Sequence, residues 1–153
     1  PPSNGWPAPW PLAGRPRAYP EGMALVTCLL THLLRDETAD NQVTLRERDG
    51  ARRLSFVIGP HEALSMERLL KRLPFPRPLT HDLLATTITA LGGRLAALAI
   101  TGMHDGTYHA ELRITDAGGT ERAIDCRPSD GLAVLLLLPG ADLLVSEELL
   151  SLP

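Results

Sequence analysis

The heptapeptide IGPHEAL at positions 58–64 returns as CRPSDGL at positions 126–132, which is 68 residues further along the chain. In both copies a proline is followed two residues later by an acid, Glu62 or Asp130, and then by apolar residues at helical spacing. A polar turn with glycine and an alternating apolar stretch precede each proline. This repeated turn–strand–helix pattern predicts an α+β domain made of two pseudo-duplicated βββα units. We expect a mostly antiparallel sheet with helices packed on it.

The rest of the chain extends this pattern to the order βββαα followed by βββαβα. Asp49-Gly50 and Asp105-Gly106 are typical of hairpin turns, and Pro74, Pro76 and Gly92 are typical of helix ends. The expected strands cover 24–34, 43–48, 53–58, 94–102, 107–115, 120–126 and 143–145. The expected helices cover 60–73, 80–91 and 128–138, with Thr80 as the cap of the second and a last helical turn near the end.

Residues 1–22 differ in composition from the rest of the chain. They contain seven prolines and both tryptophans, and they show no periodic apolar face. Such a stretch buries too little surface to offset the entropy lost on ordering. We therefore predict a disordered Pro-rich tail over 1–22 and one folded domain over 23–153.

Charge and composition exclude some classes of protein. The net charge of −3 argues against a surface that binds nucleic acid everywhere, although eight basic residues and only four acids lie between positions 46 and 77. Cys28 and Cys126 lack the spacing of a zinc site, so we expect buried, reduced thiols, as in a cytoplasmic protein. No apolar stretch reaches the ~20 residues that cross a bilayer, so we predict no membrane association.

The acids after the two prolines have a simple structural interpretation. Proline suits the first helical position, and a carboxylate there meets unpaired N–H groups and the positive end of the helix dipole. Glu62 and Asp130 fit this interpretation, as does Asp82 after Thr80. His81 is harder to explain structurally, because the dipole at a helix start disfavours an imidazolium. We therefore predict that the imidazole of His81 is neutral and available as a base or a ligand.

A second polar set lies on the strands that precede the last helix. A three-residue hairpin loop with glycine in a left-handed conformation would set Asp125 across from His109, with Glu111 and Arg113 in the same row. These groups have the chemistry of a divalent-cation site for phosphodiester hydrolysis, but a solvated hairpin face carries the same residues. A structural contact between Asp125 and Arg127 is a further interpretation.

Four blocks of the sequence resemble the bifunctional nuclease family. They are IGPHEA at 58–63, RPLTHDLL at 77–84, DGTYHA at 105–110 and IDCRPSD at 124–130, and the resemblance extends over 24–150. It implies an α+β domain that acts on both DNA and RNA. Two features depart from the usual family pattern: Gly131 stands where alanine is common, and 135–138 replace a more polar helix end.

Together these observations predict a nuclease for RNA and DNA that is assisted by a divalent metal, Mg²⁺ or Mn²⁺. The expected catalytic residues are Asp125, Asp130, His81, Asp82 and Arg127; the expected metal ligands are Asp125, His109 and Glu111; the expected substrate contacts are Arg52, Arg53, Arg77 and Ser129. The alternative is a non-enzymatic, homo-oligomeric interaction or regulatory module. It is favoured by the acidic charge and by the helix 131–138, which is apolar nearly all round and suits burial on two sides, one of them a partner subunit.

Overall fold

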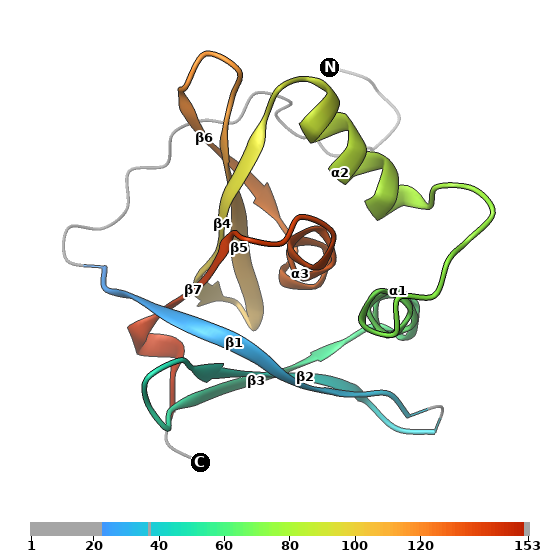
Figure 1. The fold of residues 1–153 in the computed structure, drawn as a ribbon. Helices are drawn as coiled ribbons and strands as arrows, with labels where there is room; N and C mark the ends of the chain where they lie inside the picture. The colour runs from blue at the N-terminus through green and yellow to red at the C-terminus, as the bar shows by residue number, and fades with distance from the viewer. Residues whose placement is uncertain (1–22, 37, 152–153) are drawn as a thin grey trace, which may run out of the picture.

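The computed structural model describes residues 23–36 and 38–151, which form a curved seven-stranded sheet with three helices on its concave side (Figure 1). The predicted disordered tail lies outside these described residues. The expected α+β architecture with a mostly antiparallel sheet is confirmed.

The order of elements agrees with the predicted one, and most boundaries move by only a few residues. The strands are β1 (Leu25–Leu34), β2 (Asn41–Glu47), β3 (Arg53–Ile58), β4 (Arg94–His104), β5 (Thr107–Thr115), β6 (Glu121–Cys126) and β7 (Asp142–Ser146). The helices are α1 (Pro60–Leu70), α2 (Thr80–Ala90), α3 (Pro128–Leu137) and the short 3₁₀ helix η1 (Glu147–Leu149). The cap of α2 is Leu79, and Thr80 is the first helical residue.

The sheet order is β3-β2-β1-β7-β4-β5-β6. Each βββ run therefore forms an antiparallel meander in one half of the sheet, and β7 joins the halves by pairing antiparallel with β1 and parallel with β4. Strands β3 and β6, which precede the two Pro-x-acid turns, lie at opposite edges. That the two halves superpose as duplicated units stays a prediction.

Both repeated prolines occupy the start of a helix, as predicted. Pro60 opens α1 and Pro128 opens α3, each directly after an edge strand. Each proline has a fixed φ that suits the helix and lacks an N–H that would be unpaired there. Because both edge strands end beside the concave side of the sheet, the two helix starts are brought into the same part of the molecule.

Helix α3 lies at the centre of the fold, between the other helices and the sheet (Figure 1). It packs against α1 and α2 on one side and against β4 and β5 on the other. Leu132 and Val134 are fully buried together with core residues of the sheet such as Leu98 and Ile100. The apolar character of α3 is thus explained by contacts within one chain, so this helix supplies no argument for a partner subunit.

The hairpin between β5 and β6 matches apolar faces as expected, but in a different register. The loop has three residues, 117–119, and Gly119 adopts the left-handed conformation with φ 85°. Leu112 pairs with Ile124, and Asp125 lies across from Glu111. The prediction that Asp125 faces His109 is therefore wrong by two residues. The side chain of Asp116 explains the shift, because its Oδ1 accepts hydrogen bonds from the N–H groups of Gly118 and Thr120 and fixes the loop one residue later.

No helix among the described residues is both long enough and apolar enough to span a membrane.

Candidate functional site

The first turns of the three helices form one cluster of charged side chains, which we call the helix-start cluster. Its members are Glu62 from α1, His81 and Asp82 from α2, and Arg127 and Asp130 from the start of α3. The central position of α3 explains the cluster, because α3 contacts both α1 and α2. The pair His81–Asp130 and the bridging Arg127 connect four of these residues, and Asp82, next to His81 in the chain, is paired with Arg68 of α1.

His81 and Asp130 form the first pair. Nε2 of His81 lies 2.9 Å from Oδ1 of Asp130, and both side chains are largely but not completely buried. An ionised carboxylate can only accept, so Nε2 donates its proton to Asp130 and the lone pair of the neutral ring is on Nδ1. This arrangement of an acid behind a histidine is the one that orients a general base.

Arg127 bridges the acids of two helices. Its Nε donates to Oδ2 of Asp130 at 2.7 Å and Nη2 donates to Oδ1 at 3.2 Å, while Nη1 lies 2.9 Å from Oε1 of Glu62. A guanidinium has five N–H donors, so these three contacts leave two N–H groups for another ligand. The side chain as a whole is 65% exposed.

The charges of this cluster act on the carboxyl group of Asp130. Burial raises its pKa, but hydrogen bonds from Arg127 and then from His81 outweigh burial and hold the pKa below the usual range of an aspartate. The same hydrogen bonds raise the pKa of Arg127, first through Asp130 and then through Glu62. Near neutral pH, Asp130 is therefore ionised and Arg127 is positively charged.

Asp82 forms the second pair and has a structural environment. Its two oxygens lie 3.1 and 3.0 Å from Nη2 of Arg68 on α1, and Oδ2 also accepts from the N–H of Leu79 at 2.9 Å. Burial raises the pKa of Asp82, but the hydrogen bonds from Leu79 and Arg68 outweigh burial. The pKa is therefore lower than that of an ordinary aspartate. Asp82 thus holds the start of α2 and ties it to α1, as the helix-start interpretation expects. In the described part of the chain, Nε of Arg68 is a buried polar side-chain atom that lacks a hydrogen-bond partner.

A cleft of about 320 Å³ opens beside Arg127. We call it the Arg127 cleft. Its walls are the end of β3 and the following residue (56–59), the β4–β5 turn (106–108), the start of α3 (127–129) and Glu62. Ser129, an expected substrate contact, is part of this lining and is buried. Through Arg127 and Asp130 the cleft is connected to His81 by consecutive hydrogen bonds.

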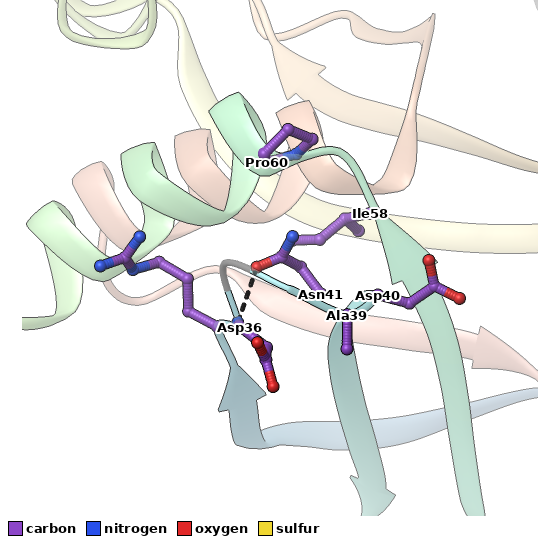
Figure 2. A pocket seen from close by; sticks show the side chains of 7 residues that line it. Asp36, Ala39, Asp40, Asn41, Ile58 and Pro60 are labelled. Atoms are coloured by element: carbon purple, nitrogen blue, oxygen red, sulfur yellow. Dashed lines mark hydrogen bonds between the residues drawn. The ribbon is translucent and has the colours of Figure 1, made fainter.

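A second cleft, of about 370 Å³, includes Pro60, the first residue of α1, in its lining (Figure 2). Asp36 and Asp40 line it, with Arg35, Ala39, Asn41, Ile58 and Pro60. Oδ1 of the buried Asn41 accepts from the N–H of Asp36 at 3.1 Å, and the Nε of Arg35 is paired with Glu67. With its one arginine already paired and two carboxylates in its wall, this cleft disfavours a phosphate.

The predicted metal ligands lie elsewhere, on the face of the sheet that points away from α3. A Cβ atom added to Gly131 of α3 would meet the side chains of Cys126 and Leu98, so these residues face the helix. Asp125 and its partner Glu111 therefore lie on the opposite face, because neighbouring residues of a strand alternate. Glu111 is buried and accepts a hydrogen bond from Nε of Arg113 at 3.1 Å.

No three His, Cys, Asp or Glu side chains among residues 23–36 and 38–151 are grouped so that they could hold a metal ion. Asp125, His109 and Glu111 therefore do not form the three-ligand site that the sequence suggested. The ring of His109 instead contacts that of His104, with centroids 5.2 Å apart.

The arginines expected to contact substrate are dispersed. Arg52 is paired with Glu47 and Glu147 at 2.8 Å each. Arg53 begins β3, so it lies roughly 17 Å along the strand from Ile58 and the Arg127 cleft. Arg77 is exposed in the loop just before α2. The structure therefore brings together His81, Asp82, Asp130, Arg127 and Ser129, and it separates them from Asp125, Arg52 and Arg53.

Both cysteines are free, as expected. Cys28 is buried and Cys126 is half-buried. Burial raises the pKa of the Cys28 thiol to about 11, and burial together with the charge of Asp125 raises that of Cys126 to about 12. Such thiols are protonated near neutral pH and are poor nucleophiles.

Sequence reasoning missed two residues of this region. Glu62 was not among the expected site residues, although its alignment with Asp130 in the 68-residue repeat indicated that the two acids converge. Tyr108 was interpreted only as an apolar position of β5, and its place in the Arg127 cleft had no signal in the sequence, because it depends on the packing of β5 beside the end of β3.

Comparisons with known proteins agree with the resemblance noted in the sequence. The sequence model of the bifunctional nuclease domain matches residues 43–152. Uncharacterized proteins from two strains of Mycobacterium tuberculosis are 37% identical to this chain over 120 residues, which cover 77% of this chain and 70% of each relative. The matched region contains all three helix starts and the whole Arg127 cleft.

Proposed function

We propose, since the chain belongs to the bifunctional nuclease domain family, that it hydrolyses phosphodiester bonds of RNA and DNA at the helix-start cluster. The observation that carries this proposal is the series Arg127–Asp130–His81, in which an arginine that lines an open cleft is hydrogen-bonded to the acid that orients His81.

In this proposal His81 is the general base. Asp130 accepts the Nε2 proton and orients the ring, so Nδ1 takes a proton from the attacking water or hydroxyl group. An acid in this role also stabilises the imidazolium that forms during the reaction. Asp82 acts as a positioning residue, because its bonds to Leu79 and Arg68 fix the first turn of α2 that carries His81.

Arg127 would hold the phosphate. A guanidinium fits two phosphate oxygens with parallel hydrogen bonds, and the two N–H groups left by its carboxylate contacts meet this need. Without Arg127, the carboxylates of Glu62 and Asp130 would repel a phosphate. The hydroxyl of Ser129 in the cleft wall supplies a neutral donor, and Arg77, exposed before α2, would guide the adjoining backbone through charge.

Assistance by Mg²⁺ or Mn²⁺ remains a separate part of the proposal. The described residues offer no three-ligand group for such an ion, so the roles given to His81, Asp130 and Arg127 involve no metal step. A substrate phosphate can itself supply metal ligands, and Mg²⁺ often binds proteins through few side chains. Cleavage with and without EDTA tests this part directly.

The test of the proposal is a cleavage assay on labelled single-stranded RNA and DNA with wild-type protein and His81→Gln. Because a positioned general base contributes about 100- to 10,000-fold, His81→Gln is expected to lower the rate by at least about 100-fold. His32→Gln, an exposed histidine on β1, is the matched control and should cleave like the wild type. Equal rates for His81→Gln and the wild type would exclude this site, and no cleavage by wild-type protein of either nucleic acid would exclude the activity.

A homo-oligomeric interaction module is the second candidate, and exposed leucines in α2 and directly after it favour this candidate. Leu83 and Leu91 are 61% and 74% exposed, and no charged residue occurs between Asp82 and Arg94. A second copy could cover this uncharged face without bringing like charges together. Sedimentation equilibrium of wild type and Leu91→Lys tests this candidate: a dimer that the substitution dissociates would support it, and a wild-type monomer at every concentration would exclude it.

A further inference from the structure

The Arg127 cleft contains two of the few aromatic side chains of this protein. The described residues include only three Phe or Tyr residues, Phe56, Phe75 and Tyr108, because Tyr19 and both tryptophans lie in 1–22. Phe56 and Tyr108 both line the cleft, and their ring centroids are 5.4 Å apart with an interplanar angle of 46°. Phe56 is buried, whereas Tyr108 is half-buried. Phe56 therefore packs against the Tyr108 ring and restricts its position, and Tyr108 stays partly accessible.

We propose that Tyr108 is the stacking platform for a nucleobase, and that the Arg127 cleft binds one unpaired nucleotide next to the phosphate held by Arg127. The inference rests on the proposed function and adds the kind of substrate that this site accepts. A preoriented aromatic ring stacks on any base, because every base has a π-face. This tolerance suits an enzyme that acts on more than one nucleic acid.

The walls of the cleft fit a flat ligand. Gly59 and Gly106 both belong to the lining and contribute no side chain, and the carboxylate of Glu62 lies against Gly59. A Cβ atom added at Gly106 would meet no atom within 4 Å, which marks open space beside the turn that leads into Tyr108. A base can therefore approach the backbone at this wall. The polar groups of Arg127 and Ser129 are placed along the same lining, where the sugar and phosphate of that nucleotide would lie.

The size of the cleft selects an unpaired substrate. At about 320 Å³ the cleft is at the lower end of the roughly 300–1,000 Å³ that small-ligand sites occupy. This volume suits one nucleotide and not a base pair. A base can stack on a protein ring only after it leaves its neighbours and its partner, which costs least in a single strand. We therefore expect single-stranded RNA and DNA to be preferred over duplexes.

Binding of two small probes to wild-type protein tests the base contact. Adenosine 5′-monophosphate and ribose 5-phosphate share the sugar and the phosphate and differ in the base. Because stacking on one aromatic residue contributes on the order of 10-fold to affinity, the nucleotide should bind about 10-fold more tightly than the sugar phosphate. Equal affinities for the two probes would overturn the proposal, because no base contact would then exist.

Substitutions of Tyr108 locate the contact. Tyr108→Phe keeps the ring and should retain the difference between the probes, whereas Tyr108→Leu should lower nucleotide binding to the level of ribose 5-phosphate and leave the sugar phosphate unaffected. Phe75→Leu removes an exposed aromatic residue outside the cleft and is the matched control. Wild-type nucleotide affinity in Tyr108→Leu would overturn the assignment.

Tyr108 packs on Phe56, so folding of the leucine variant needs an independent measurement. In wild-type protein, nuclear Overhauser effects between the Tyr108 ring and the adenine H2 or H8 proton are expected at saturating nucleotide. Their absence while the nucleotide is bound would contradict stacking even if Tyr108→Leu fails to fold.

Failure of this inference is distinguishable from failure of the proposed function. A wild-type protein that cleaves RNA but shows no base-dependent binding would support the nuclease activity and exclude the base contact at Tyr108. Base-dependent binding without any cleavage would support the base contact at Tyr108 and exclude the nuclease activity.

Discussion

The first turns of α1 and α3 have the same Pro-x-acid pattern but different surroundings. Glu62 of α1 has Gly59 before its proline, whereas Asp130 of α3 has Arg127 in the corresponding place and also bonds to His81. The helices that follow differ in the same sense: α1 lies at the surface with Leu64 54% exposed, while its counterpart Leu132 in α3 is completely buried. The comparison shows that a helix-start acid gains a possible chemical role from its neighbours, since the local pattern is the same in both turns.

The largest expected difference between the two helices is in stability. Leu132→Ala removes a fully buried side chain and should lower the free energy of unfolding by about 2–5 kcal/mol. Leu64→Ala, at the corresponding place in α1, should cost less than about 1 kcal/mol, because the side chain is already largely in water. Urea denaturation of both variants measures the difference, and equal losses would mean that α3 is not the central helix.

Arg127 provides the next comparison, because α1 has only a glycine in its place. Arg127→Met should raise KM for a single-stranded oligonucleotide by about 10- to 100-fold, the range expected for lost hydrogen bonds to a charged group. The exposed Arg94 at the opposite end of β4 from the cleft is the control, and Arg94→Met should leave KM as in the wild type. An equal rise in KM for both variants would indicate that only overall charge matters.

The smallest expected effect is the response of stability to acid. The pKa of Asp130 is lowered in the folded state, since the bonds from Arg127 and His81 outweigh burial. A lowered pKa stabilises the folded protein at pH values above about 3.9, which is the pKa of an aspartate in the unfolded chain. This contribution is lost as the pH falls through the pKa of Asp130 in the folded state. Below about pH 4, the free energy of unfolding of Asp130→Asn should therefore fall less steeply than that of the wild type. Parallel curves in acid denaturation would contradict the contribution of Asp130.

Local sequence signals were sufficient for most of the fold. Pro60 and Pro128 mark helix starts because their fixed φ and missing N–H suit only that position. Alternation over β5 and the Asp105-Gly106 turn defined the second hairpin. These features depend on neighbouring residues, and a single sequence contains that information.

Features that depend on tertiary placement were predicted only in part. His81, Asp130 and Arg127 were predicted as one site together with Asp82 and Asp125, and the packing of α3 against α2 does bring the first three together. The register of Asp125 was wrong because the Asp116 side chain fixes the loop one residue later than expected, and this moves the cross-strand partner by two residues. The Arg127–Glu62 contact joins residues 65 positions apart in sequence, and the Arg127 cleft joins 56–59 with 106–108 and 127–129, so no local pattern specifies these contacts.

Two aspartates on opposite faces of the sheet, Asp130 and Asp125, distinguish an active site at the helix starts from one on the outer face of β5 and β6. Single-turnover cleavage of single-stranded RNA should be at least about 100-fold slower for Asp130→Asn than for the wild type, because the histidine loses its orienting acid. Asp125→Asn, on the face away from α3, should stay within about threefold of the wild type, as expected for a residue outside the site. A large loss for Asp125→Asn together with wild-type cleavage by Asp130→Asn would contradict the account and move the active site to the outer face of β5 and β6.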